Sequence, residues 1–298
     1  MEDVKKLYFI YNPCSGRGQI RSRLFDILQV FSGAGYEMTV HPTREAKDAV
    51  RQIEQLPEGY DLVVCSGGDG TMDEVVQGMM MREHRIPIGY IPSGTVNDFA
   101  RSLKLPRNMV RAAQIAVEGR DFPCDMGTFN GEHFVYIAAF GIFTDVSYST
   151  RQDVKNVLGH MAYLLEGMKR LTNIPSYHIV LSGDGYAAEG EYIFGMVTNS
   201  RSVGGFKSII GRNVQFDDGV FEVTFIRRPQ NAVELQELLT SIIRKEIDSR
   251  YMDSFRTSHL VVESELPIPW TLDGEFGGEW QSAIIQNHQK ALRIRVDN

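Results

Sequence analysis

The stretch CSGGDGTMDEVV, residues 65–76, sets three glycines around a single acid, Asp69, where two sequence patterns meet. Residues 61–64 (DLVV) form a short apolar run typical of a buried strand, and residues 72–80 have the spacing of an amphipathic helix. Glycine after a strand allows positive φ and close approach of another group to the backbone, while the first turn of a helix presents unpaired N–H groups. The stretch therefore predicts a phosphate-binding turn between a strand and a helix.

The flanking residues repeat this alternation of strand and helix. We expect strands at residues 6–12, 36–41, 61–66 and 86–92, and helices at residues 18–35 and 43–56, the second opened by Thr43. Such alternation is typical of a parallel sheet with crossover helices, whose ligands bind beyond the carboxyl ends of the strands. Residues 1–128 are therefore predicted to form an α/β domain with a parallel sheet.

The pattern changes after residue 128. Strand-like runs separated by turn signals predict a mainly antiparallel β domain over residues 129–298, interrupted by helices at about residues 151–173 and 231–245. The strand-like runs are YHIVLS (177–182), GEYIFGMVTNS (190–200), GVFEVTFIRR (219–228), SHLVVE (258–263) and ALRIRV (291–296).

Composition and charge exclude several classes of function. The formal net charge of −7 argues against a nucleic-acid binder, because affinity for phosphate backbones rests on clustered Lys and Arg. No charge-free apolar stretch approaches the roughly 20 residues of a transmembrane helix, and the N-terminus does not read as a secretory signal. The three cysteines lack the CxxC spacing of a zinc site. We expect a cytoplasmic protein whose partners are small or lipidic.

Two further loops resemble the opening stretch in composition. YNPCSGRGQ (11–19) follows the first expected strand, and its small residues are well placed to touch a nucleotide. IPSGTVNDFAR (91–101) follows the fourth and adds a second carboxylate, Asp98. A carboxylate beside a polyphosphate would be repelled without a cation between them, so Asp69 implies Mg²⁺, which Asp98 could share.

A fourth motif lies far along the chain. WTLDGEFGG (270–278) places Asp273, Gly274 and Glu275 on an expected turn, and an acid there is a candidate general base for phosphoryl transfer. No GxxxxGK[ST] loop and no protein-kinase signature occurs in the sequence. The four motifs therefore indicate another phosphate-handling design.

Taken together, these motifs match a known family. NPCSGRG (12–18), GGDGTMDE (67–74), PSGTVNDFAR (92–101) and LDGE (272–275), in this order, resemble the diacylglycerol kinase catalytic-domain family, specifically its soluble bacterial lipid kinases related to sphingosine kinases. The resemblance covers essentially the whole chain. It implies an N-terminal α/β nucleotide domain like those of NAD kinases and phosphofructokinases, a C-terminal β-sandwich, and an ATP site in the cleft between them.

The resemblance also implies roles for individual residues. Asp69 and Asp98 would organise the catalytic Mg²⁺, and Glu275 would be the base that activates the lipid hydroxyl. A second, structural metal would be held by the carboxylate of Asp218 and the backbone carbonyls of Gln215 and Val220, although relatives carry a second acid at the position of Gln215. The ATP site would be lined by Asn12, Pro13, Cys14, Ser15, Gly16, Thr43, Gly67, Gly68, Asp69, Gly70, Thr71, Glu74, Ser93, Gly94, Thr95 and Asn97.

The resemblance implies an ATP- and Mg²⁺-dependent lipid kinase, with diacylglycerol as the best-guess acceptor and phosphatidic acid as the product. A kinase of another hydroxyl lipid, such as phosphatidylglycerol or a sphingoid base, and a non-catalytic nucleotide-binding regulator remain alternatives. An NAD kinase would be expected to carry a TGSTAY-like motif in the second domain, and none occurs. The family further implies a homodimer, and we expect peripheral contact with the inner face of the membrane.

Overall fold

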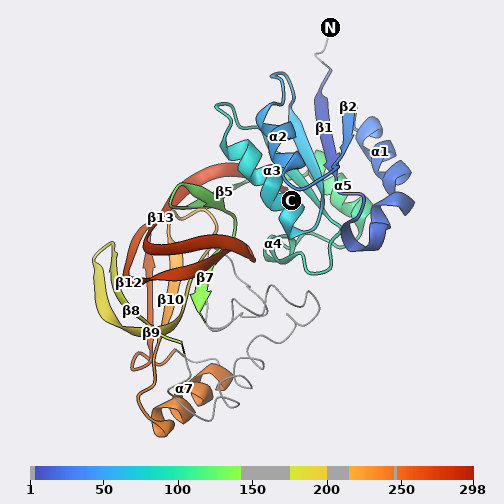
Figure 1. The fold of residues 1–298 in the computed structure, drawn as a ribbon. Coiled ribbons are helices and arrows are strands. Elements are labelled where there is room, and N and C mark those ends of the chain that lie inside the picture. The colour runs from blue at the N-terminus through green and yellow to red at the C-terminus, as the bar shows by residue number, and fades with distance from the viewer. Residues whose placement is uncertain (1–3, 142–174, 200–214, 245–246) are drawn as a thin grey trace. The chain divides into compact units, whose positions relative to one another are not determined.

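The computed structural model describes residues 4–141, 175–199, 215–244 and 247–298. The chain forms two compact units, of which the first comprises residues 1–125 with Lys290–Asn298 and the second comprises Met126–Gln289. Both units are built on β-strands (Figure 1). Within the described ranges, no helix has the length and apolar character needed to cross a bilayer.

The first unit is built on a parallel sheet. Its strands run in the order β2 (Glu37–Pro42), β1 (Lys6–Tyr11), β3 (Leu62–Gly67) and β4 (Ile88–Pro92), and every pairing among them is parallel. The four strands expected from the sequence are therefore present. Because all four run the same way, their carboxyl ends meet at one edge.

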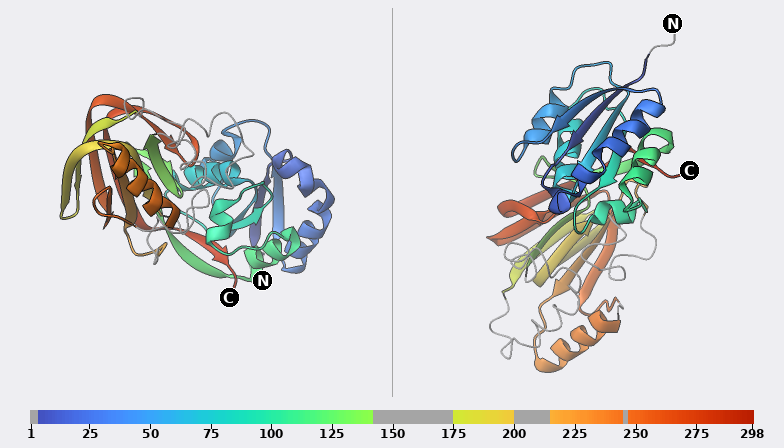
Figure 2. Two further views of the ribbon diagram at one scale, coloured as in Figure 1. Left: turned by 90° about the horizontal axis from the view of Figure 1, so that it is seen from below. Right: turned by 90° about the vertical axis from the view of Figure 1, so that its right-hand side faces the viewer.

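Helices cover both faces of this sheet (Figures 1 and 2). On one face, α1 (Leu24–Gly33) and α5 (Met109–Glu118) pack on β1, β3 and β4 through a buried apolar cluster. On the other, α3 (Asp69–Met80) packs on β3 and against α2 (Asp48–Glu54). The short elements η1 (Ser15–Ser22) and α4 (Asp98–Ser102) follow β1 and β4.

Two helices begin later than the sequence predicted. The helix expected from residue 18 begins at Leu24, after the 3₁₀ helix η1, because Gly16 and Gly18 have φ of +54° and +72°. The helix expected to open at Thr43 begins at Asp48, because Lys47 holds the left-handed conformation with φ of +61°. Left-handed residues cannot continue an α-helix.

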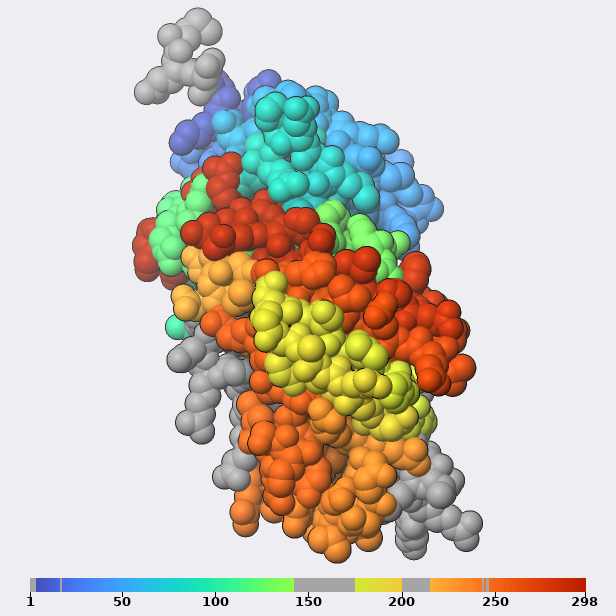
Figure 3. Space-filling model, turned by 90° about the vertical axis from the view of Figure 1, so that its left-hand side faces the viewer, coloured from blue at the N-terminus to red at the C-terminus, as the bar shows by residue number. Residues whose placement is uncertain are grey.

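The second unit is mainly antiparallel. Its strands pair in the order β11, β10, β9, β7, β12 and β13, with β8 beside both β12 and β9, and the hairpin of β8 and β9 is exposed on the face shown in Figure 3 (yellow). The elements are β5 (Arg120–Phe129), β6 (Glu132–Phe134), β7 (Ile137–Gly141), β8 (Tyr177–Gly183), β9 (Tyr186–Thr198), β10 (Phe221–Arg227), α7 (Ala232–Arg244), β11 (Met252–Thr257), β12 (His259–Leu272) and β13 (Glu275–Val296).

An aromatic core fills this unit. Trp270 is fully buried, and its ring lies 4.9 Å from that of Phe129 and 4.8 Å from that of Phe140, between centroids. Contacts at this spacing add to the stabilisation from apolar burial. The helix expected near residue 231 is present as α7, whereas the one expected at 151–173 lies outside the described residues.

The first unit combines the N-terminal part of the chain with Lys290–Asn298. The run ALRIRV (291–296) was predicted to belong to the antiparallel domain, but residues 290–298 belong to the first unit. There Ile294, near the end of β13, pairs in parallel with Ile88 of β4. Residues 290–298 therefore extend the parallel sheet at its open edge, although the residues before them in β13 belong to the second unit.

Candidate active site

The loops predicted to bind a nucleotide all leave the same edge of the parallel sheet. Asn12–Gly16 follow β1, Thr43 follows β2, Gly68 follows β3, and Ser93–Asn97 follow β4. Backbone bonds continue the strand pairing into these loops, from Asn12 N to Ser66 O (2.9 Å), Thr43 N to Tyr11 O (2.8 Å) and Ser93 N to Gly67 O (2.8 Å). The structure thus brings these predicted residues together along one edge.

Glycine is required where these loops touch. A Cβ atom built on Gly16 would lie 1.8 Å from the carbonyl oxygen of Ser93, and one on Gly94 would lie 2.6 Å from the Cα of Gly68. Gly16 also has φ of +54°, a conformation that favours glycine. The loops after β1, β3 and β4 are therefore packed backbone against backbone.

Two asparagines fix the shape of the loops. Asn12 accepts the N–H of Cys14 (2.9 Å) and donates to Thr71 Oγ1 (3.3 Å), which ties the first loop to the start of α3. Asn97 accepts the N–H of Gly94 (3.0 Å) and donates to its carbonyl (2.7 Å). Both side-chain amides bond to atoms of the loops or of the helix start beside them. The loops therefore have their shape before a ligand binds.

The two acids expected to hold Mg²⁺ begin different helices, Asp69 at the start of α3 and Asp98 at the start of α4. Asp69 Oδ1 accepts the N–H of Phe99 (3.3 Å), while Asp98 is buried, with its carboxylate 3.7 Å from Arg101. Burial raises the pKa of Asp69, against the backbone N–H groups near residue 98 and the charge of Arg101, which act to lower it. A divalent cation beside Asp69 would offset the cost of burying this carboxylate, so Asp69 fits one, whereas Asp98 already faces Arg101.

Two hydroxyls at this edge have no hydrogen-bond partner. Ser66 and Ser93 are 0% and 4% exposed, and within the described part of the chain neither Oγ atom is bonded. Buried hydroxyls normally find partners, so these two are unsatisfied donors beside the loops. Ser93 was predicted from the sequence, whereas Ser66 was missed. The sequence feature that could have identified Ser66 is its position directly before the glycine pair at the end of β3.

Glu74, which was expected to line the ATP site, contacts the start of α2. Its two carboxylate oxygens accept the N–H groups of Lys47 (2.9 Å) and Ala49 (3.1 Å) and so cap α2. Asp48, which is buried, accepts the N–H of Arg44 (2.9 Å) and contacts His41 Nε2 (3.1 Å). Two carboxylates therefore hold the loop that follows Thr43.

The LDGE motif forms a tight hairpin in the second unit. Asp273 and Gly274 have φ of +51° and +89° and join β12 to β13, with Leu272 paired to Glu275. Positive φ at both central residues is typical of a type I′ turn, for which Asp-Gly is a preferred sequence. Glu275 is exposed, and within the described residues its side chain makes no hydrogen bond or ion pair.

Of the residues expected to hold a structural metal, Asp218 has its carboxylate bonded within the protein. Asp218 forms an ion pair with Arg256, and its other oxygen accepts the N–H of Val220 (3.3 Å). Arg256 also contacts Glu222 (3.4 Å), whose pKa is raised by burial to about 7 although Arg256 acts to lower it. A divalent cation at this turn would lie beside the guanidinium, so the residues as arranged do not fit one; Gln215 is exposed.

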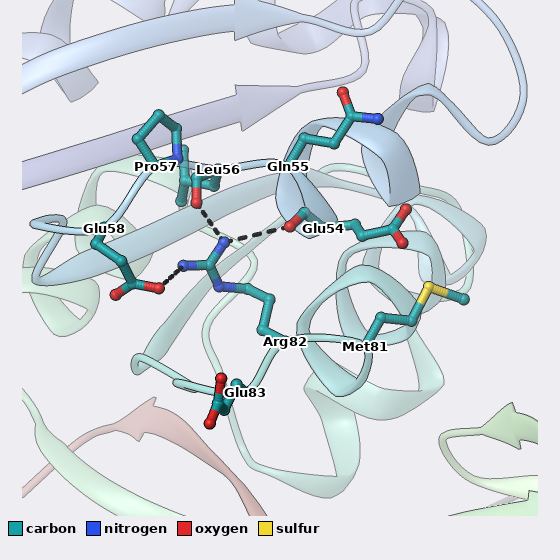
Figure 4. A pocket seen from close by; sticks show the side chains of 8 residues that line it. All are labelled: Glu54, Gln55, Leu56, Pro57, Glu58, Met81, Arg82 and Glu83. Carbon is teal, nitrogen blue, oxygen red and sulfur yellow. Dashed lines mark hydrogen bonds and ion pairs between the residues drawn. The ribbon is translucent and has the colours of Figure 1, made fainter.

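A hollow elsewhere in the first unit is lined by Arg82 and seven other residues (Figure 4). The buried guanidinium of Arg82 donates to the carbonyl oxygens of Ile53 (3.1 Å), Glu54 (3.4 Å) and Leu56, and pairs with Glu58 (3.2 Å). Arg82 follows the end of α3, about 18 Å along that helix from the glycine turn. The hollow is therefore separate from the nucleotide loops, and Arg82 caps the end of α2.

Comparison with known proteins agrees with these motifs. The family model described as the diacylglycerol kinase catalytic domain matches residues 6–129. The diacylglycerol kinase of Bacillus subtilis (strain 168) is 34% identical over 278 residues, covering 92% of this chain and 91% of that protein. That of Staphylococcus carnosus (strain TM300) is 32% identical over 287 residues, covering 96% and 93%.

Solved structures share the fold. The crystal structure of a diacylglycerol kinase from Bacillus anthracis strain Sterne superposes with a TM-score of 0.76 at 24% identity, covering 100% of this chain and 98% of that one. A second structure from the same organism gives a TM-score of 0.82 at 26% identity, covering 98% and 95%. The resemblance drawn from the motifs is confirmed, and the chain belongs to the diacylglycerol kinase family of lipid kinases.

Proposed function

We propose that the protein transfers the γ-phosphoryl group of ATP to the free hydroxyl of diacylglycerol, which yields phosphatidic acid. The relatives named above are diacylglycerol kinases, which supports this acceptor. The observation that carries the proposal is the edge of the parallel sheet, where glycine loops meet two carboxylates and two buried hydroxyls without partners. Such an edge suits a polyphosphate with its cation.

The loops would bind and orient the phosphates. Backbone N–H groups at Gly16 and Gly68, together with the hydroxyls of Ser66 and Ser93, would donate to phosphate oxygens. Mg²⁺, bound with ATP near Asp69 and Asp98, would neutralise charge on the phosphates. Phosphoryl transfer is accelerated mainly by positioning and charge neutralisation, so these groups would supply most of the catalysis.

Glu275 would accept the proton of the lipid hydroxyl. It is exposed at the first position of β13, and no described residue neutralises it. Glu275→Gln keeps the shape of the side chain but removes the base, so turnover should fall while ATP binding stays unchanged. Glu279→Gln, at another exposed position of the same strand, is the matched control and should behave as wild type.

The acceptor is tested by transfer of labelled phosphate from ATP in the presence of Mg²⁺. Diacylglycerol, phosphatidylglycerol, sphingosine and NAD would be compared, with Asp69→Ala as the inactive control. Labelling of diacylglycerol that depends on Asp69 is the expected result. Labelling of phosphatidylglycerol or sphingosine instead would replace the acceptor, and ATP binding without labelling of any acceptor would favour the non-catalytic regulator.

The finer assignments of fold and location belong to the same proposal. We infer that the first unit has the fold type of NAD kinases and phosphofructokinases and that the second unit is a β-sandwich. Both inferences stay predictions. The protein is expected to act as a homodimer from the cytoplasm and to contact the inner face of the membrane without crossing it. Sedimentation with vesicles of phosphatidylglycerol and diacylglycerol would test membrane contact, and recovery of all the protein in the supernatant would contradict it.

A further inference from the structure

The carboxylate of Asp273 is enclosed by backbone donors. Its oxygens accept the N–H groups of three consecutive residues, Val135 (2.6 Å), Tyr136 (2.9 Å) and Ile137 (3.0 Å). A carboxylate whose oxygens already accept three backbone N–H bonds has little hydrogen-bonding capacity left for a substrate. Of the two acids in the LDGE motif, Asp273 is therefore the one whose carboxylate is used in hydrogen bonds within the protein.

The rest of Asp273 is tied to the same segment. Its N–H donates to Ile137 O (2.9 Å), and the hydroxyl of Tyr136 donates to its carbonyl oxygen (3.1 Å). The carbonyl of Tyr136 in turn accepts from Thr198 Oγ1 (2.8 Å) and from Asn199 N (3.1 Å) at the end of β9. The turn is thus joined through Tyr136 to a third part of the unit.

This anchoring acts on Glu275 through the turn. Only Gly274 separates the two acids, and both central residues of the turn hold positive φ, which leaves the hairpin little freedom once Asp273 is fixed. The pairing of Leu272 with Glu275 closes it. The position of the Glu275 backbone is therefore set by the bonds of Asp273, which cross 136 to 138 residues of chain.

We propose that Asp273 is a positioning residue, which anchors the Asp273–Gly274 turn on the N–H groups of residues 135–137 and thereby holds Glu275 in place for proton transfer. This inference rests on the proposed role of Glu275 as the base. The fixed turn is what allows an exposed carboxylate on a hairpin to be placed with the accuracy that catalysis requires.

The chain contains a matched control. Asp184 and Gly185 form another Asp-Gly turn, between β8 and β9, with Gly183 paired to Tyr186. The carboxylate of Asp184 also anchors its turn, because it accepts the N–H (2.7 Å) and the hydroxyl (2.6 Å) of Ser258. No residue assigned to the site belongs to this turn, so its loss reports the effect of loosening a hairpin alone.

The test compares Asp273→Asn and Asp184→Asn in steady-state kinetics and thermal unfolding. Asp273→Asn is expected to lower kcat by about 10- to 100-fold with KM for ATP unchanged, because the turn shifts while the nucleotide loops do not. Asp184→Asn should lower Tm to a similar extent and leave kcat unchanged. Tyr136→Phe removes one anchor and keeps the carboxylate, so it should give a smaller loss of kcat in a folded protein.

A double mutant separates this inference from the proposed function. If Asp273 acts through Glu275, the Asp273→Asn/Glu275→Gln protein should be no slower than Glu275→Gln alone. Additive losses of kcat in the double mutant would overturn the positioning role and leave the base assignment standing. A wild-type kcat in both Asp273→Asn and Tyr136→Phe, with Glu275→Gln inactive, would have the same meaning. Normal turnover by Glu275→Gln would overturn the base assignment, and the positioning role with it.

Discussion

Replacing Gly16 with alanine should separate the packing of the nucleotide loops from the stability of the fold. The new Cβ would lie 1.8 Å from Ser93 O, and real contacts of this kind are essentially never shorter than 3.0 Å. The two loops must therefore move apart by about 1.2 Å. Displacements of about 1 Å at a catalytic site cost on the order of 100-fold in rate, so kcat/KM for ATP should fall by at least that factor.

Gly35→Ala provides the control for backbone strain. Gly35 has φ of +79°, and a Cβ atom there would meet nothing within 4 Å. Gly35→Ala should lose about 1–2 kcal/mol of stability from the left-handed conformation, and Gly16→Ala at least as much, measured by chemical denaturation. Only Gly16→Ala should lose ATP affinity by calorimetry and turnover by a coupled assay. Equal kcat/KM in the two variants would refute the view that the close approach of Gly16 to Ser93 shapes the phosphate site.

Three further predictions concern stability, pH and metal. Arg82→Met should lower the free energy of unfolding by roughly 2–4 kcal/mol, because it leaves buried carbonyls at the end of α2 unpaired; a wild-type denaturation midpoint would contradict this capping role. Burial acts to raise the pKa of Asp253, but hydrogen bonds from Tyr192, Tyr186 and Arg227 lower this pKa overall. The stabilisation by ionised Asp253 is therefore complete at neutral pH and is lost as pH falls below about 4. Asp253→Asn should flatten the fall of Tm at acid pH, and an unchanged fall would refute this prediction. Because Arg256 neutralises Asp218, nucleotide-free protein should keep its Tm in EDTA, whereas a fall that Mg²⁺ restores would show a structural metal at the turn.

The features that sequence predicted well depend on short stretches of chain. Strands β1 to β4 follow from runs of apolar residues, and the turn at Gly67 and Gly68 follows from the glycines themselves. Helix starts were predicted less well, because α2 begins where Glu74 holds the N–H groups of Lys47 and Ala49. Both bonds join residues more than 20 positions apart in the sequence, so no local sequence pattern predicts them.

The acids in the motifs show the same limit in the site. A glycine-rich turn exposes N–H groups, and a carboxylate nearby is as good a partner for them as for a metal or a substrate. Glu74 and Asp273 both serve the backbone, and Asp218 serves Arg256, although sequence placed all three in functional motifs. Glu275 makes no such bond within the described residues. Composition cannot distinguish these cases, because the partner that commits an acid lies elsewhere in the chain, and only the fold shows which carboxylates remain free for chemistry.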